Sequence, residues 1–169
     1  MAVTGSVNFT GTFTERVSKD LGASSDTNQL TQNTDFTDGT GAAQVNLVWS
    51  DTRSLSASTS ENLDLAGGLT SGLGATLTFA RIKHISIRNN TTTAGFTLEV
   101  GGAASNAFST LFGATADYLI IRPGGVFTIT APDAIGYVVT AGTADILKIN
   151  NPNGGGAVSY SIVIAGSNA

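Results

Sequence analysis

Closely spaced turn residues divide the second half of the chain into short segments, and this spacing limits the folds it can adopt. Pairs of turn-forming residues, such as Pro123 with Gly124, recur roughly every ten residues. The segments between them are rich in β-branched and aromatic residues, and no long stretch has the period of a helix. This pattern is typical of an all-β sandwich or barrel. We expect a β-sandwich, jelly-roll-like, with an N-terminal strand arm and a long polar loop.

The expected strands of the sandwich domain lie between these turns. Apolar residues at 108, 111 and 112 have helical spacing, so we expect one helical turn there. The remaining segments alternate in polarity or form short apolar runs. We expect strands at residues 43–50, 62–65, 82–88, 95–100, 118–121, 126–129, 136–140, 145–149 and 158–164.

The N-terminal segment has a different pattern. Residues 7–17 alternate, with Val7, Phe9 and Phe13 on one face and threonines on the other, which predicts a strand arm. Residues 19–42 are polar and have no clear period, so we expect a long connection with one short strand near Leu30. The predicted division is an arm and connection over 1–42 and a sandwich domain over 43–169.

Phe9 and Phe13 are the residues that we expect at a protein interface. Exposed aromatic side chains on a strand arm need a partner to cover them. Strand addition to an open sheet edge is one known way for such an arm to bind.

Composition argues against most enzymes. The chain has no cysteine and one histidine, and charged residues make up 12% of it, against about 25% in typical domains. A thiolate metal site, a cysteine nucleophile or a multi-histidine site therefore has no residues to use. The net charge of −4 gives no attraction for nucleic acid, and no apolar run reaches the roughly 20 residues of a membrane span. We expect no catalytic residues, no metal and no cofactor.

Three groups of residues have both a functional and a structural interpretation. His84 could be a catalytic base, but no orienting carboxylate or nucleophile accompanies it, so we favour a structural histidine. Asp35 and Asp38 could hold calcium or hydrolyse glycosides, but an Asp-Gly turn explains them more simply. The amphipathic aromatic residues could form a sugar-stacking platform, although core or rim positions are commoner. They are Trp49, Tyr118, Tyr137 and Tyr160.

Several turn and strand segments, taken together, resemble small virion structural proteins of tailed phages and prophages. The resemblance covers about residues 40–167 and includes Arg122-Pro123-Gly124-Gly125. It implies a β-rich, non-enzymatic component of a capsid or particle. The segments are residues 51–55, 63–69, 77–83, 122–127 with 131–133, 139–145 and 162–166.

On this basis we expect a capsid decoration, or cement, protein on the outer surface of a bacteriophage virion. It would clamp adjacent subunits of the major capsid protein and form a homotrimer, because shells present local three-fold positions. The alternative is a receptor- or glycan-binding module of a tail or head spike, since sandwiches host both roles. A glycan hydrolase is a third, weaker hypothesis because the chain lacks an acid-base constellation.

Overall fold

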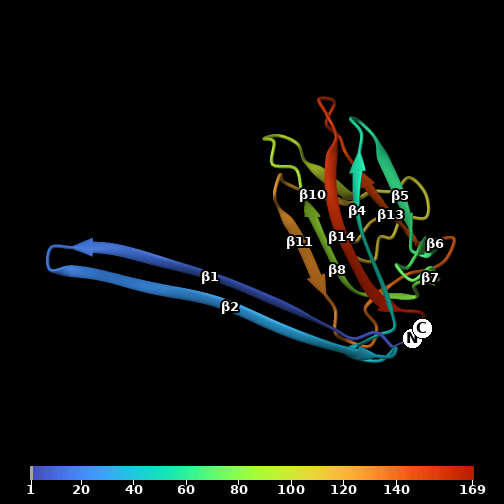
Figure 1. The fold of residues 1–169 in the computed structure, drawn as a ribbon, viewed down its shortest axis with the longest axis horizontal. Coiled ribbons are helices and arrows are strands. Elements are labelled where there is room, and N and C mark those ends of the chain that lie inside the picture. Colours follow the sequence, from blue (N-terminus) through green and yellow to red (C-terminus); the bar gives the residue numbers. More distant parts are fainter. Residues whose placement is uncertain (1) are drawn as a thin grey trace.

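The computed structural model describes residues 2–169 as an all-β protein with a body and a long projecting arm (Figure 1). These residues form no helix, and so none that is long and apolar enough to cross a membrane. The strands are β1 (Gly5–Lys19), β2 (Gly22–Asp38), β3 (Gln44–Val45), β4 (Leu47–Leu55), β5 (Ser60–Asp64), β6 (Ala66–Thr70), β7 (Thr76–Thr78), β8 (Arg81–Asn89), β9 (Leu98–Gly101), β10 (Tyr118–Ile121), β11 (Val126–Thr130), β12 (Tyr137–Val138), β13 (Ile146–Asn150) and β14 (Val158–Ser167).

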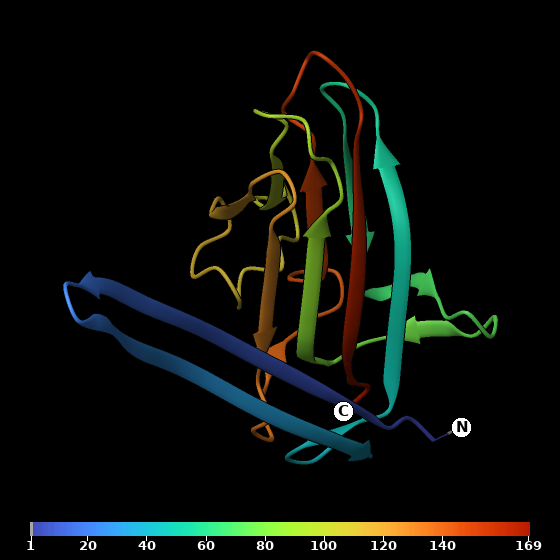
Figure 2. The same ribbon diagram turned by 60° about the vertical axis from the view of Figure 1, so that its left-hand side comes forward.

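Two antiparallel sheets make up the body. The strand order is β11-β8-β14-β4 in the first, here called the front sheet, and β10-β9-β13-β5 in the second, the back sheet. The short strand β12 also pairs with β8, and β6 and β7 form a separate hairpin beside the body. The arm, β1 with β2, leaves the lower end of the body and crosses in front of the front sheet (Figure 2).

Alternation along the strands places one face of each sheet in a shared apolar core. In β14 the side chains of Val158, Tyr160, Ile162 and Ile164 are buried, while the residues between them face outward, as the sequence predicts. Buried leucines and isoleucines from β5, β9 and β13 belong to the same cluster. Removal of this apolar surface from water is the main force that holds the two sheets together.

Two buried asparagines fasten the loops at the upper end of the body. The Asn151 side-chain amide donates to the carbonyl oxygens of Leu55 (3.2 Å), Ser56 (2.9 Å) and Gly156 (3.0 Å). Asn89 donates in the same way to the carbonyl oxygens of Phe96 and of Ile121 at the end of β10. These bonds satisfy backbone groups that the strands leave without ladder partners, which a buried loop requires.

The expected connection over residues 19–42 is wrong, because residues 22–38 form the single long strand β2. Both faces of this strand lie outside the body for most of its length, so its sequence needs no apolar period. The expected helical turn is a hydrogen-bonded turn that no helix continues: the Ser109 carbonyl oxygen accepts from the amides of Phe112 (2.9 Å) and Gly113 (2.8 Å).

A β-bulge interrupts the pairing of β8 with β14. Ala165 pairs with His84 and Gly166 pairs with Ile82, so Lys83 is the extra residue. A Cβ atom added at Gly166 would overlap the Arg81 carbonyl oxygen and press on the Phe79 ring. The bulge therefore depends on a residue without a side chain at position 166.

We expect Gly166→Ala to lower the free energy of unfolding by about 1–3 kcal/mol, because overpacking against rigid backbone forces the strands apart. Chemical denaturation of the two proteins measures the difference. Gly72→Ala is the matched control, since a Cβ atom there meets nothing within 4 Å. Equal stability of the two variants would contradict the close approach described here.

Candidate interaction surface

The arm is one uninterrupted antiparallel ribbon. Its pairs run from Gly5 with Phe36 to Lys19 with Gly22, and Asp20 and Leu21 form the turn at the tip. At roughly 3.4 Å per residue, the 15 residues of β1 extend about 50 Å. A third strand, β3, pairs only with the end of β2 at the root, and a two-stranded ribbon is at best marginally stable alone in water.

The register gives the arm two chemically different faces. One face carries threonine, asparagine, serine and glutamine side chains from both strands. The other carries all the large apolar side chains of β1 and β2, because Leu30 lies opposite Gly11 and Phe36 lies opposite Gly5. The exposed members of this apolar face are here called the arm stripe. They are Phe9, Phe13, Val17 and Leu30, together with the half-buried Val7 at the root, and Glu15 and Asp26 lie on the same face between Phe13 and Val17.

The body holds the arm at its root. The Phe36 ring is buried in a depression lined by Val48, Val163 and Ala165 on the outer face of the front sheet. The Asp38 carboxylate accepts a hydrogen bond from the Val3 amide at 2.9 Å. The short strand β3 pairs with the end of β2, so backbone bonds also fix the direction in which the arm leaves.

His84 lies beneath the arm root. Its side chain lines the depression that receives Phe36, and its Nδ1 atom lies 3.1 Å from the Thr130 hydroxyl. Burial disfavours the charged imidazolium and lowers the pKa of His84 below its ordinary value of 6.5. The structure therefore places the single histidine of the chain as a neutral, packed side chain.

The free energy of unfolding should fall as the pH drops below about 7. The unfolded chain protonates His84 near pH 6.5, whereas the folded chain does so only at lower pH, so acid favours unfolding through this window. Urea denaturation at pH 7.5 and pH 5.5 measures the loss. His84→Gln, which does not titrate, should show a smaller difference between the two pH values; an unchanged difference would rule out His84 as the cause.

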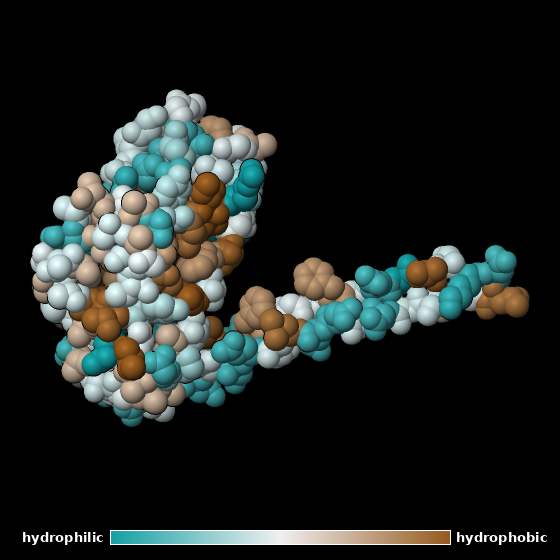
Figure 3. Space-filling view, turned by 180° about the vertical axis from the view of Figure 1, so that it is seen from behind, coloured by the Kyte–Doolittle hydropathy of each residue, from teal (hydrophilic) through white to brown (hydrophobic). Residues whose placement is uncertain are grey.

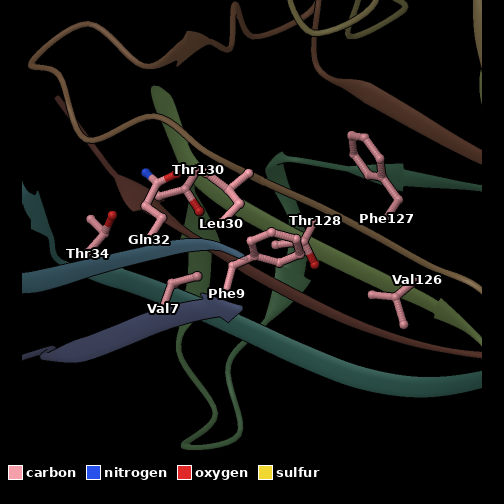
Figure 4. Close-up of a pocket in the computed structure, with 9 residues that line it drawn as sticks. All are labelled: Val7, Phe9, Leu30, Gln32, Thr34, Val126, Phe127, Thr128 and Thr130. Carbon is pink, nitrogen blue, oxygen red and sulfur yellow. The ribbon is translucent and has the colours of Figure 1, made fainter. Parts of the chain in front are cut away.

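A cleft of about 560 Å³ separates the root of the stripe from the edge strand β11. Phe9 and Leu30 project from the arm into the space where Thr128 and Thr130 project from β11 (Figure 4). Val126, on the same edge strand, is also exposed. Apolar side chains therefore line both sides of the angle between arm and body, as the space-filling view also shows (Figure 3).

The stripe is largely open to solvent, both beside the cleft and beyond it. The exposed fraction is 51% for Phe9, 77% for Phe13 and 68% for Leu30. No charged residue occurs in residues 5–14 or 27–34, so the middle of the arm is uncharged on both faces. Large apolar side chains without neighbouring charge are typical of the centre of a protein interface. The arm is therefore the strongest candidate for a functional surface.

Sequence reasoning named Phe9 and Phe13 and missed Leu30. All three lie on one face of the arm, which brings the two predicted residues together with a third from the segment expected to be a loop. Their contact with a partner stays a prediction. The signal for Leu30 is its pairing with Gly11, which becomes visible only when the two strands are aligned.

The acidic pair has no shared site. Asp35 pairs with Ser6 on the polar face of the arm, whereas Asp38 lies on the opposite face at the root. Among residues 2–169 no group of three metal-ligating side chains comes together. Neither position carries the two facing carboxylates that glycoside hydrolysis uses.

Two of the four amphipathic aromatic residues are buried inside the body. The Tyr160 hydroxyl donates to the Glu61 carboxylate at 2.7 Å, and Arg53 pairs with that carboxylate while its guanidinium lies 5.3 Å from the centre of the Trp49 ring. Burial, followed by the Glu61 hydrogen bond, raises the pKa of Tyr160, so its hydroxyl stays protonated. This network links the front sheet to β5 and is structural.

Tyr118 is different, because its ring is exposed beside a polar hollow of about 340 Å³ on the back sheet. Glu99 and Lys148 also line this hollow. The Glu99 carboxylate accepts a hydrogen bond from the Asn150 side-chain amide at 2.7 Å, which fixes its position. The fourth aromatic residue, Tyr137, is half-buried on β12.

Comparison with known proteins gives no relative for this arrangement. A scan against protein-family models, a search of curated proteins and a search of solved structures each found no match. The interpretation of the surfaces follows from their own geometry and chemistry.

Proposed function

We propose that this chain is a virion structural protein, a capsid decoration protein that clamps adjacent subunits of the major capsid protein. The observation that carries the proposal is the arm, a ribbon about 50 Å long with an uncovered apolar stripe. Such a surface suits a protein that works in contact with other chains. The segments that resemble phage virion proteins support the same conclusion.

We infer that the body is a β-sandwich of the jelly-roll type. Eight strands form the two main sheets, and they pair as one long hairpin does: first with last, second with seventh, third with sixth, and fourth with fifth. These neighbours are β4 with β14, β5 with β13, β8 with β11, and β9 with β10. Jelly rolls occur in viral capsid proteins and in lectins, so the fold is compatible with either of these roles.

The proposed mechanism is an increase in the interface area that must break before the shell opens. A stable protein interface buries about 1,600 Å² in total, and several linked contacts on one particle strengthen one another. A homotrimer on the outer surface would engage the capsid subunits around a local three-fold position. In this proposal the body binds one capsid subunit, and the arm extends to contact a neighbouring subunit.

Capsids without this chain should rupture at a lower temperature than intact capsids. The measurement is the release of packaged nucleic acid from stripped and intact particles during heating. Adding back the wild-type chain should restore the rupture temperature. Rupture at the same temperature with and without the chain would overturn the clamp.

Arm variants refine this measurement. Adding back Phe13→Ser should fail to restore the rupture temperature, because it interrupts the arm stripe at its most exposed ring. Thr12→Ser is the matched control on the polar face and should restore it. If Phe13→Ser restores the temperature fully, the arm stripe has no part in the clamp.

A second candidate function, a glycan-binding module of a tail or head spike, is favoured by the hollow at Tyr118. An exposed aromatic ring can stack on a sugar, while Glu99 and Lys148 offer hydrogen-bond groups beside it. We therefore keep glycan binding as the alternative to decoration.

A glycan array probed with the wild-type chain tests the alternative. If the hollow binds sugar, Tyr118→Ala should weaken any signal by about tenfold or more, since it removes the stacking ring. Ile135→Ala, at an exposed apolar side chain that does not line the hollow, should leave the signal unchanged. An array without hits counts against glycan binding.

A further inference from the structure

We infer that the arm stripe of one copy docks in an apolar groove on the opposite edge of the next copy, so that identical chains join head to tail. This inference rests on the proposed function, because it names the surface through which the decoration protein assembles. The occupant of the groove is therefore a second copy of this chain.

The groove lies between β4 and the β6–β7 hairpin and has a volume of about 480 Å³. Strand β4 is an edge strand of the front sheet, with β14 as its only neighbour, so its outer side is open. The side chain of Leu73 is 75% exposed and Val48 is 42% exposed. The main apolar residues of the groove are Val3, Leu47, Val48, Leu73, Ala75 and Leu77.

The groove and the arm stripe have matching chemistry. No charged residue lines the groove, and no charged residue occurs in the middle of the arm. The charges of the arm lie toward its tip and its root, and Glu15 with Asp26 on the stripe face separates Val17 from the uncharged part of the stripe, which is Val7, Phe9, Phe13 and Leu30. Contact between two uncharged apolar surfaces avoids the loss of hydration that an unpaired buried charge would suffer.

The positions of the two surfaces exclude a contact within one chain. The arm extends beyond the β11 edge of the body, whereas the β6–β7 hairpin lies on the far side (Figure 1, Figure 2). The root fixes the direction of the arm through backbone pairing and the buried Phe36 ring. A stripe directed away from its own groove can reach only the groove of another copy.

This contact is heterologous, because it joins two different surfaces of the same chain. Heterologous contacts repeat around an axis and close into a ring when the rotation permits. The uncharged part of the stripe, residues 7–13, covers about 24 Å at 3.4 Å per residue. A two-stranded ribbon about 10 Å wide then gives this part a footprint of about 240 Å², so the contact must also bury surface next to the stripe to reach the usual 800 Å² per partner.

The mass of the full chain in solution, measured by light scattering after size-exclusion chromatography, tests the inference. The wild-type chain should elute as an oligomer, while Phe13→Ser and Leu73→Asp should each elute at the 17.1 kDa of a single chain. Thr12→Ser, on the polar face of the arm, should remain oligomeric. Thermal unfolding of each variant shows whether the body stays folded, and Leu30→Ser and Val48→Ser replace any variant that does not fold.

Mixing distinguishes a head-to-tail contact from other modes. Phe13→Ser retains a working groove and Leu73→Asp retains a working arm, so an equimolar mixture should form dimers that neither variant forms alone. Because the chain has no cysteine, Phe13→Cys mixed with Leu73→Cys should give a disulfide-linked dimer under mild oxidation. A disulfide of Phe13→Cys with itself in preference to the mixed product would indicate arm-to-arm packing and overturn the inference.

The remaining outcomes separate this inference from the proposed function. A wild-type monomer that still binds capsids through Phe13 would overturn the inference and leave decoration standing, with the capsid as occupant of the arm stripe. An oligomer that depends on Phe13 and Leu73 but binds no capsid would support the inference and overturn decoration.

Discussion

The pairing of β14 with its two neighbours is the constraint on which the rest of the structure depends. This last strand lies between β4 and β8, so it joins the beginning and the middle of the body in one sheet. Its inward side chains, with Tyr160 and Ile162 among them, are buried in the core. Its outward side chains, Val163 and Ala165, help to form the depression that receives Phe36. The same strand therefore contributes one face to the core and the other face to the contact with the root of the arm.

Strands with one buried face were predictable from the sequence, because burial imposes a period of two. Residues 158–164 show this in β14. Residues 7–17 of β1 have the same period although neither face is buried, and this led to Phe9 and Phe13 as interface candidates. Strand β2 was missed because its polar residues follow no period. Its order comes from backbone hydrogen bonds with β1, which the peptide groups of polar and apolar residues form alike. A local reading of one strand cannot show what pairing with another strand supplies.

The candidate surfaces differ in the same way. The arm stripe could be predicted only in part. Phe9 and Phe13 lie on one strand, whereas Leu30 joins them only through the register of β1 with β2. The groove could not be predicted from the sequence, because Leu47 and Leu73 belong to separate elements that only the folded body brings together. The bulge at Lys83 depends on Gly166, more than eighty residues away, so no local pattern in β8 indicates it. The pattern of one segment indicates which face of a strand is apolar, whereas the groove and the bulge are formed by residues from separate elements.

The uncharged middle of the arm has a thermodynamic consequence. Association through it contains no ion pair for dissolved salt to screen, so its strength should be nearly independent of ionic strength. Its driving force is the release of water from apolar surface, which is entropic near room temperature and fades on cooling. An assembly joined through the arm, as proposed, would tolerate changes in salt concentration and would be weakest in the cold.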